Sequence, residues 1–251
     1  MNSYKSSSYS SEKGLTLLEM SVVLVIVSLI AIGIFVGRDL KRNSEVMSAI
    51  KDLQNFHSAI QTFKDKYSYL PGDIPNAGDY WTNAAGTGTW NGDGDHTIDT
   101  RTEGFEAWCQ LEMAQIIPEI YLACEGDTRS GGGGKSTPEY NIPKGDIDFS
   151  GYILYNTLAA PIFGNEGNFL RLGLDSTATN SHLEKPIFQG KEAWLIDNKI
   201  DDGQPDTGKI LGHLTGTDGG SCVQNGYNDP NSGPYTTILD TKDCFITYIL
   251  D

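Results

Sequence analysis

Basic side chains are scarce in this sequence, and their scarcity argues against one large class of function. Only 18 of the 251 residues are Lys or Arg, against 33 Asp or Glu, which gives a formal net charge of −15. Nucleic-acid binding relies on basic side chains that displace counterions from phosphates, so a chain this acidic is a poor candidate for it. The same charge makes the chain a better candidate for binding cations.

Histidines and catalytic motifs are also few. The four histidines (His57, His96, His182 and His213) are scattered without metal-site spacing, and no Gly-x-Ser-x-Gly is present. The Gly-rich stretch 130–137 contains Lys135-Ser136, but it lacks the preceding apolar strand and following helix of a phosphate-binding loop. We therefore expect a structural or binding protein and not an enzyme.

Only one apolar run is long enough to cross a membrane. Residues 15–37 contain a single charge, Glu19. At about 1.5 Å per residue, such a helix spans a hydrocarbon core of roughly 30 Å. The chain is therefore expected to cross the membrane once.

The residues around the start of this run form a distinctive motif, Lys13-Gly14-Leu15-Thr16-Leu17-Leu18-Glu19-Met20. A secretory signal peptide is cut after its apolar run, whereas the only plausible junction here lies before it. Cleavage after Gly14 would leave the helix on the mature chain and create an α-amino group at Leu15, about one helical turn from Glu19. A carboxylate in a membrane segment costs about 2.5–3.5 kcal/mol, which suggests a function. The alternative is an ordinary signal-anchor whose Glu19 lies at the headgroup level.

The stretch from Gly14 to Glu19 resembles the class III signal of type IV prepilins and type II secretion pseudopilins. That signal has Gly, an apolar residue that is usually Phe, Thr, two apolar residues and Glu, and this chain has Leu15 in place of Phe. The resemblance implies cleavage between Gly14 and Leu15 by a prepilin peptidase and N-methylation of Leu15. It also implies that Leu15, Thr16 and Glu19 act in filament assembly, with Glu19 docking each subunit.

The resemblance and the hydrophobic pattern together predict a type IV pilin-like α+β fold. A long N-terminal helix, half of it transmembrane, packs against a globular head with a small antiparallel sheet and long loops. The expected parts are a removed leader (1–14), a membrane or filament-core half of the helix (15–37), an amphipathic half (38–69) and the head (70–251). Within the head we expect a helix over 103–120, strands over 147–158, 169–174 and 245–250, and a short helix or strand over 191–199.

Two acidic loops of the head are candidate calcium sites. In the first, Asn91, Asp93, Asp95 and Asp99 recur as in an EF-hand-type loop, although His96 stands where that loop has a sharp-turn Gly. In the second, oxygens would come from Asp197, Asp201, Asp202 and Asp206. The alternative for both loops is a set of Asp-capped turns without an ion. No cofactor other than Ca²⁺ is suggested.

Four cysteines in an exported head favour two disulfides. We expect the pairs Cys109–Cys124 and Cys222–Cys244, which is one of the three possible pairings. The second pair would close a loop near the C-terminus.

The leading interpretation is a subunit of a type IV pilus. The alternatives are a pseudopilin of a type II secretion system and a membrane-anchored, calcium-binding adhesin that does not polymerise. Partners would be further copies of the chain, the prepilin peptidase and methyltransferase, and an inner-membrane assembly platform. Before assembly the chain would cross the inner membrane once with its head in the periplasm; afterwards it would lie in a surface pilus or a periplasmic pseudopilus. The basic residues Arg38, Lys41 and Arg42 favour the opposite orientation under the positive-inside rule, and we give the prepilin signal the greater weight.

Overall fold

A computed structural model provides the structure of the chain. It describes residues 16–81, 91–98, 101–118, 136–156, 167–174, 183, 185–213, 222–223, 233–236 and 241–250. The chain forms two compact units, Met1–Ser44 and Glu45–Asp251, which are described separately below. We call the second unit the head.

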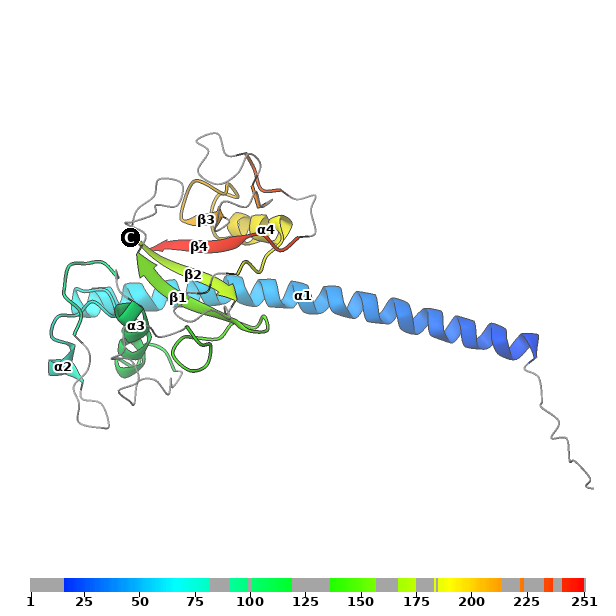
Figure 1. Ribbon diagram of the computed structural model, residues 1–251, viewed down its shortest axis with the longest axis horizontal. Coiled ribbons are helices and arrows are strands. Elements are labelled where there is room, and N and C mark those ends of the chain that lie inside the picture. The colour runs from blue at the N-terminus through cyan, green and yellow to red at the C-terminus, as the bar shows by residue number, and fades with distance from the viewer. Residues whose placement is uncertain are drawn as a thin grey trace, which may run out of the picture. The chain divides into compact units, whose positions relative to one another are not determined.

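The longest element is helix α1, which runs from Leu17 to Tyr67 without a break (Figure 1). Its 51 residues contain no proline, so nothing in the sequence interrupts the hydrogen-bond ladder. The helix ends at Tyr67, two residues before the predicted bound of 69. Ser68 adopts a left-handed backbone (φ 64°), and its N–H donates to the Lys64 carbonyl at 2.8 Å, which is a helix-ending αL motif.

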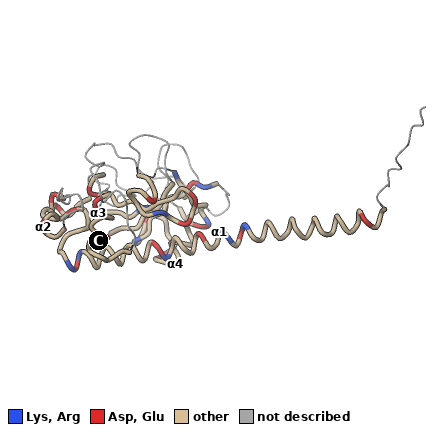
Figure 2. The backbone as a smooth tube through the Cα atoms, turned by 90° about the horizontal axis from the view of Figure 1, so that it is seen from below, with Lys and Arg blue, Asp and Glu red and all other residues tan. Residues whose placement is uncertain are grey.

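From Met20 to Gly37, helix α1 is apolar on every face. Between Glu19 and Arg38 no residue is charged, as Figure 2 shows. Within the described residues, α1 is the one helix long and apolar enough to cross a membrane. A helix that is apolar all round is suited to a membrane or to the dry interior of an assembly.

The head is built on a four-stranded antiparallel sheet. The strands are β1 (Ser150–Asn156), β2 (Asn168–Leu174), β3 (Ile210–His213) and β4 (Phe245–Leu250), in the order β1-β2-β4-β3. The last strand β4 therefore inserts between β2 and β3, which ties the C-terminal segment into the middle of the sheet. Figure 1 shows helix α3 (Arg101–Met113) beside β1, helix α4 (Gly190–Ile200) beside β3 and the short helix α2 (Ala77–Tyr80) near the end of α1.

The core of the head lies between the sheet and the second half of α1. Seven side chains of α1 are buried there at helical spacing: Val46, Ala49, Ile50, Leu53, Ala59, Ile60 and Phe63. The half-buried Phe56 packs edge-on against Trp108 of α3 and Tyr152 of β1, with ring centroids 5.0 and 4.9 Å away. Tyr152 also donates its hydroxyl to Asp52 at 3.1 Å. Aromatic and polar contacts thus join α1, α3 and the sheet.

Three element predictions needed correction. Helix α3 was predicted to reach Ile120, but it ends at Met113. Gln115 has a left-handed backbone (φ 58°), its N–H donates to Glu112, and the next N–H donates to Leu111, which is the Schellman arrangement that terminates helices. The strand predicted from residue 147 begins at Ser150, because the preceding residues form a turn.

The third correction is strand β3, which was not predicted. Its four residues, Ile-Leu-Gly-His, are too few to show the alternation of a strand. The segment predicted as helix or strand over 191–199 is helix α4, and the strand predicted over 245–250 is β4. The α+β fold, with a long N-terminal helix and a small antiparallel sheet, is confirmed.

Candidate functional site

The N-terminal end of α1 is closed by a reciprocal pair of side chains, Thr16 and Glu19. The backbone N–H and the Oγ1 hydroxyl of Thr16 donate to Glu19 Oε2 at 2.8 and 2.9 Å. The Glu19 N–H donates back to Thr16 Oγ1 at 3.2 Å. This is a capping box, in which two otherwise unpaired N–H groups at the helix start are satisfied.

The sequence itself contains the signal for this pair. A Thr followed three residues later by a Glu before an apolar run is the pattern of a capping box. The processing residues Gly14 and Leu15 lie outside the described residues. Thr16 follows Leu15 directly, so the carboxylate of Glu19 is held at the end of the helix next to the predicted new terminus. Its negative charge also lies at the positive end of the helix dipole.

Behind this cap, the helix exposes its large apolar side chains. The large apolar residues from Leu17 to Val36 are exposed on the chain, among them Leu24, Ile30 and Phe35. Isolated exposed leucines are ordinary, but a contiguous apolar surface of this size marks an interaction with lipid or protein. The arrangement therefore combines an apolar rod with one carboxylate at its tip.

Comparison with known families identifies this combination. A family model described as "Prokaryotic N-terminal methylation motif" matches residues 9–35. The chain carries the N-terminal signal of type IV pilins and pseudopilins. The match spans Gly14, Leu15, Thr16 and Glu19 and most of the apolar run. Comparison with curated proteins and with solved structures gave no match.

The pilin-type signal therefore precedes a head for which the comparisons supply no relative. It supports a prepilin- or pseudopilin-type precursor with a membrane-anchoring apolar helix. It implies processing by a prepilin peptidase and assembly into a filament. Any further site in the head has to be argued from the structure.

The first acidic cluster of the head is formed by Asp73, Asp93 and Asp95. Each offers a carboxylate oxygen, and these oxygens lie within 4.8 Å of one another. Asp73 is fully buried, whereas Asp93 and Asp95 are exposed. Burial, opposed in part by its hydrogen bonds, raises the pKa of the Asp73 carboxyl, and hydrogen bonds from Thr97 lower the pKa of Asp95. Asp73 was not among the predicted ligands because it lies on a different loop, before them in the sequence.

The loop from Asn91 to Ile98 is folded around Asp73. The N–H groups of Gly94 and His96 donate to the two oxygens of Asp73 at 2.8 and 2.9 Å. His96 takes the left-handed backbone (φ 71°) that glycine supplies at the sharp turn of an EF-hand-type loop. Asn91 Oδ1 accepts from the Gly78 N–H at 3.0 Å. The predicted ligand Asp99 lies outside the described residues.

The second acidic cluster joins Asp197, Asp201 and Asp202, again with oxygens within 4.8 Å of one another. Asp197 is fully buried at the end of α4 and accepts from the Gly203 N–H at 3.0 Å and the Tyr235 hydroxyl at 2.7 Å. Asp202 accepts from the Gln204 N–H and the Thr207 hydroxyl. Burial raises the pKa of Asp197 to about 7.

The structure also describes the predicted ligand Asp206 and three of the four cysteines predicted to form disulfides. Asp206 lies on the same loop and is partly exposed. Cys222 and Cys244 form the predicted disulfide. Cys109 is also disulfide-bonded, and its predicted partner Cys124 lies outside the described residues.

The second cluster is tied to the disulfide segment. Tyr235, which bonds Asp197, lies between the two bridged cysteines, and the Thr236 N–H donates to the Cys222 carbonyl at 2.9 Å. A Cβ on Gly212 of β3 would lie 2.1 Å from the Tyr235 ring, so this approach requires glycine. The acidic loop, β3 and the disulfide segment therefore form one packed structure.

Both clusters have the contacts of Asp-capped turns and also retain capacity for a cation. Carboxylates accept up to about four hydrogen bonds, and the contacts above use only part of that capacity. Hard cations such as Ca²⁺ take six to eight oxygen ligands from carboxylates, carbonyls and water. The geometry permits calcium binding at each cluster, which stays a prediction.

Proposed function

We propose that this chain is the precursor of a filament subunit, cleaved after Gly14, N-methylated at Leu15 and assembled into a type IV pilus or a related filament. The single observation that carries the proposal is the capped apolar helix within the methylation motif. Its carboxylate, Glu19, is held at the tip of an uncharged surface that extends to Arg38.

Cleavage after Gly14 would create a positive charge that can pair with the Glu19 carboxylate. The new α-amino group at Leu15 is cationic, and in a filament the amine of one subunit can meet Glu19 of its neighbour. An unpaired carboxylate in an apolar interior is strongly disfavoured, and pairing with an amine offsets much of that cost. The capping box restrains Glu19 by bonding Oε2 to Thr16. Glu19 therefore favours one axial register of neighbouring helices over others.

The remaining steps follow from the anchored precursor. The helix holds the chain in the inner membrane with its head in the periplasm. Prepilin peptidase and methyltransferase process the terminus, and an inner-membrane platform adds subunits to the filament. Head-to-tail contacts generate a helical filament when the rotation from one subunit to the next does not close into a ring, and this is the case we propose.

Two alternatives share the same signal. A pseudopilin of a type II secretion system would be processed identically but would remain periplasmic. A membrane-anchored adhesin would keep its helix in the membrane and not polymerise. Neither the apolar helix nor the acidic head favours one of these over the other.

The test is Glu19→Ala in the full chain, with Glu19→Gln as the matched variant that keeps shape without charge. We expect both variants to be cleaved and methylated, while filaments fall at least tenfold because an amine then faces no carboxylate. Filament yield is measured in sheared material, and the terminus by mass spectrometry. Normal filaments from Glu19→Ala would refute the docking role.

A further inference from the structure

A cluster of basic side chains follows the apolar run of α1. Arg38, Lys41 and Arg42 are three of the chain's 18 basic residues, and they fall within five positions after the uncharged run seen in Figure 2. Arg38 and Lys41 are exposed, and Arg42 is partly exposed. With Asp39, the segment 38–42 has three positive charges and one negative, a formal charge of +2 on a chain whose total is −15. We call Arg38, Lys41 and Arg42 the basic cluster.

The basic cluster lies on one face of the helix. Steps of three and four residues lead from Arg38 to Lys41 and Arg42, and residues at this spacing are neighbours on a helix surface. Asp39 is about 100° further round the helix than Arg38, at 3.6 residues per turn. The acidic Glu45 follows on the cluster face, three residues after Arg42. The three cations can therefore contact one anionic surface together.

The distance from Glu19 to the basic cluster matches the thickness of a hydrocarbon core. Arg38 lies 19 residues (38 − 19) beyond Glu19, which is about 28 Å along the helix. The hydrocarbon core of a bilayer is roughly 30 Å thick. When Glu19 lies at one surface of the core, Arg38 lies at the other, and Lys41 and Arg42 lie about 4.5 and 6 Å beyond it. The basic cluster is then at the depth of the lipid headgroups.

Phosphate is the anion at that depth, and the cluster has the side chains that bind it. The planar guanidinium of an arginine donates two parallel N–H groups to two oxygens of one phosphate, and a lysine adds a point charge. Lys and Arg residues beside a membrane helix are attracted to anionic phospholipids. The cluster thus combines the position, the donors and the net charge that such a lipid requires.

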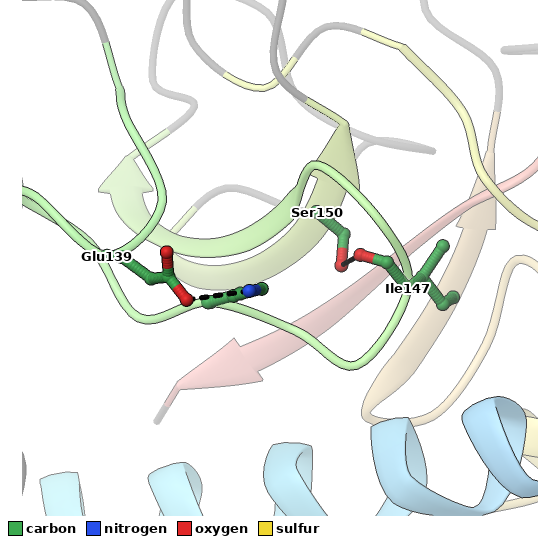
Figure 3. A network of polar contacts seen from close by, with 4 residues as sticks. Glu139, Ile147 and Ser150 are labelled. Atoms are coloured by element: carbon green, nitrogen blue, oxygen red, sulfur yellow. Dashed lines mark hydrogen bonds and ion pairs between the residues drawn. The ribbon is translucent and has the colours of Figure 1, made fainter.

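A basic residue of the head has the opposite surroundings. Lys144 donates to Glu139 at 2.6 Å (Figure 3), and the exposed Asp146 and Asp148 follow on the same turn. The hydrogen bond and charge of Glu139, with smaller contributions from the two aspartates, raise the pKa of Lys144. This cation is neutralised within its own turn. The net positive charge of the segment 38–42 is what distinguishes the basic cluster from such a pair.

We propose that the basic cluster binds the phosphates of anionic phospholipids, of the phosphatidylglycerol class, at the head-side surface of the membrane. The proposal rests on the membrane-anchored precursor of the proposed function and names the lipid that the precursor contacts. It gives the three cations a partner on the head side, where the positive-inside rule alone does not expect them. Glu19 at one surface and the basic cluster at the other then set the depth of the helix.

The experiment measures the lipids that the purified full chain retains in detergent, by native mass spectrometry. The chain is offered equal amounts of phosphatidylglycerol and phosphatidylcholine with the same acyl chains; both contain phosphate, but only the first has a net negative charge. We expect the unaltered chain to retain at least fivefold more phosphatidylglycerol. Equal retention of the two lipids would overturn the proposal.

A triple variant tests whether the basic cluster causes this preference. Arg38→Gln, Lys41→Gln and Arg42→Gln together are expected to reduce the ratio of the two lipids at least threefold. The leader residues Lys5 and Lys13 stay in every variant, so the change in the ratio reports the cluster. The melting temperature of the head is expected to stay the same, because the replaced residues precede the head. An unchanged lipid ratio in the triple variant would contradict the proposal.

The matched control removes the same charge from the head part of the same helix, through Lys51→Gln, Lys64→Gln and Lys66→Gln. We expect this control to keep the lipid ratio of the unaltered chain, and an equal reduction in both triple variants would overturn the proposal. If the cluster variant loses filaments but keeps its lipid ratio, the cluster contacts neighbouring subunits and not lipid. The lipid measurement needs no filaments. An unaltered chain that selects phosphatidylglycerol but gives neither filaments nor methylated Leu15 would therefore refute the proposed function alone.

Discussion

The two parts of helix α1 contain the same apolar residue types, but these are exposed in the first part and buried in the second. Leu24 is 67% exposed and Leu53 is 0% exposed, and Phe35 and Phe63 differ in the same way, at 67% and 0%. From Val46 to Phe63 the buried apolar residues of α1 occupy one face and pack in the head core, whereas between Glu19 and Arg38 apolar residues cover the whole helix. Apolar content therefore does not distinguish the two parts; what differs is whether the chain supplies its own covering surface. The first part must find lipid or other subunits.

The largest expected effect is a loss of head stability on truncation of Phe63, which distinguishes this buried residue from the exposed Phe35. Phe63→Ala is expected to lower the free energy of unfolding of the head by about 3–5 kcal/mol, because it empties a fully buried position. Phe63 packs on Tyr67 with ring centroids 4.6 Å apart. The measurement is thermal unfolding of the full chain in detergent micelles.

Phe35→Ala is the matched control for this prediction. It removes the same atoms from the same helix, but from an exposed position. We expect an unchanged melting temperature of the head and a loss of filament yield. Equal destabilisation by the two substitutions would show that the division between the two parts of α1 is wrong.

Loss of the Cys222–Cys244 disulfide is expected to have the next largest effect. Replacing both cysteines by Ser opens a bridge between residues 22 apart and is expected to cost about 2–4 kcal/mol of head stability. The effect should be confined to the head, because the first unit contains no cysteine. Denaturant unfolding followed by tryptophan fluorescence measures it, and an unchanged midpoint would contradict the prediction.

Calcium removal is expected to act on the head alone. If the acidic clusters bind Ca²⁺, a free concentration one hundred times Kd adds about 2.7 kcal/mol to the stability of the head. Chelation should therefore lower its melting temperature, with Asp95→Asn and Asp202→Asn reducing the response cluster by cluster. The same melting temperature with and without chelator would mean that both clusters serve only as Asp-capped turns.

A further expected effect is a pH dependence that originates at Asp197. Its pKa is about 7 in the folded head, against an ordinary value of 3.8. Between these values the unfolded chain releases the proton while the folded head retains it, so stability falls as pH rises through about 4 to 7. In chelator, Asp197→Asn should flatten this part of the stability profile. An equal slope in the variant would assign the pH dependence to other groups.

The sequence predicted those features that depend on local patterns. The long N-terminal helix was predicted from its hydrophobic pattern to within two residues of its end at Tyr67, and β4 followed from its apolar run. The end of α3 was missed because it depends on the left-handed backbone of Gln115, a residue without the usual preference for that conformation. Strand β3 was missed because four residues carry too little pattern.

The acidic clusters show a different limit of sequence reasoning. Asp93 and Asp95 were found by their alternate spacing, but Asp73 joins them only through tertiary structure. Gly92 allows this approach, since a Cβ there would lie 2.4 Å from the Asp73 Cα. In the same way, Tyr235 reaches Asp197 from 38 residues away. Spacing identifies ligands on one loop and not those that a second loop contributes.

The most direct test of the central claim is mass spectrometry of the N-terminus in sheared surface material and in membranes. The account predicts a peptide that begins at methylated Leu15 in the sheared fraction, which would establish an assembled pilin. The same peptide confined to membranes would favour the pseudopilin alternative. An intact Met1 terminus in both fractions would contradict the account and leave only an anchored head.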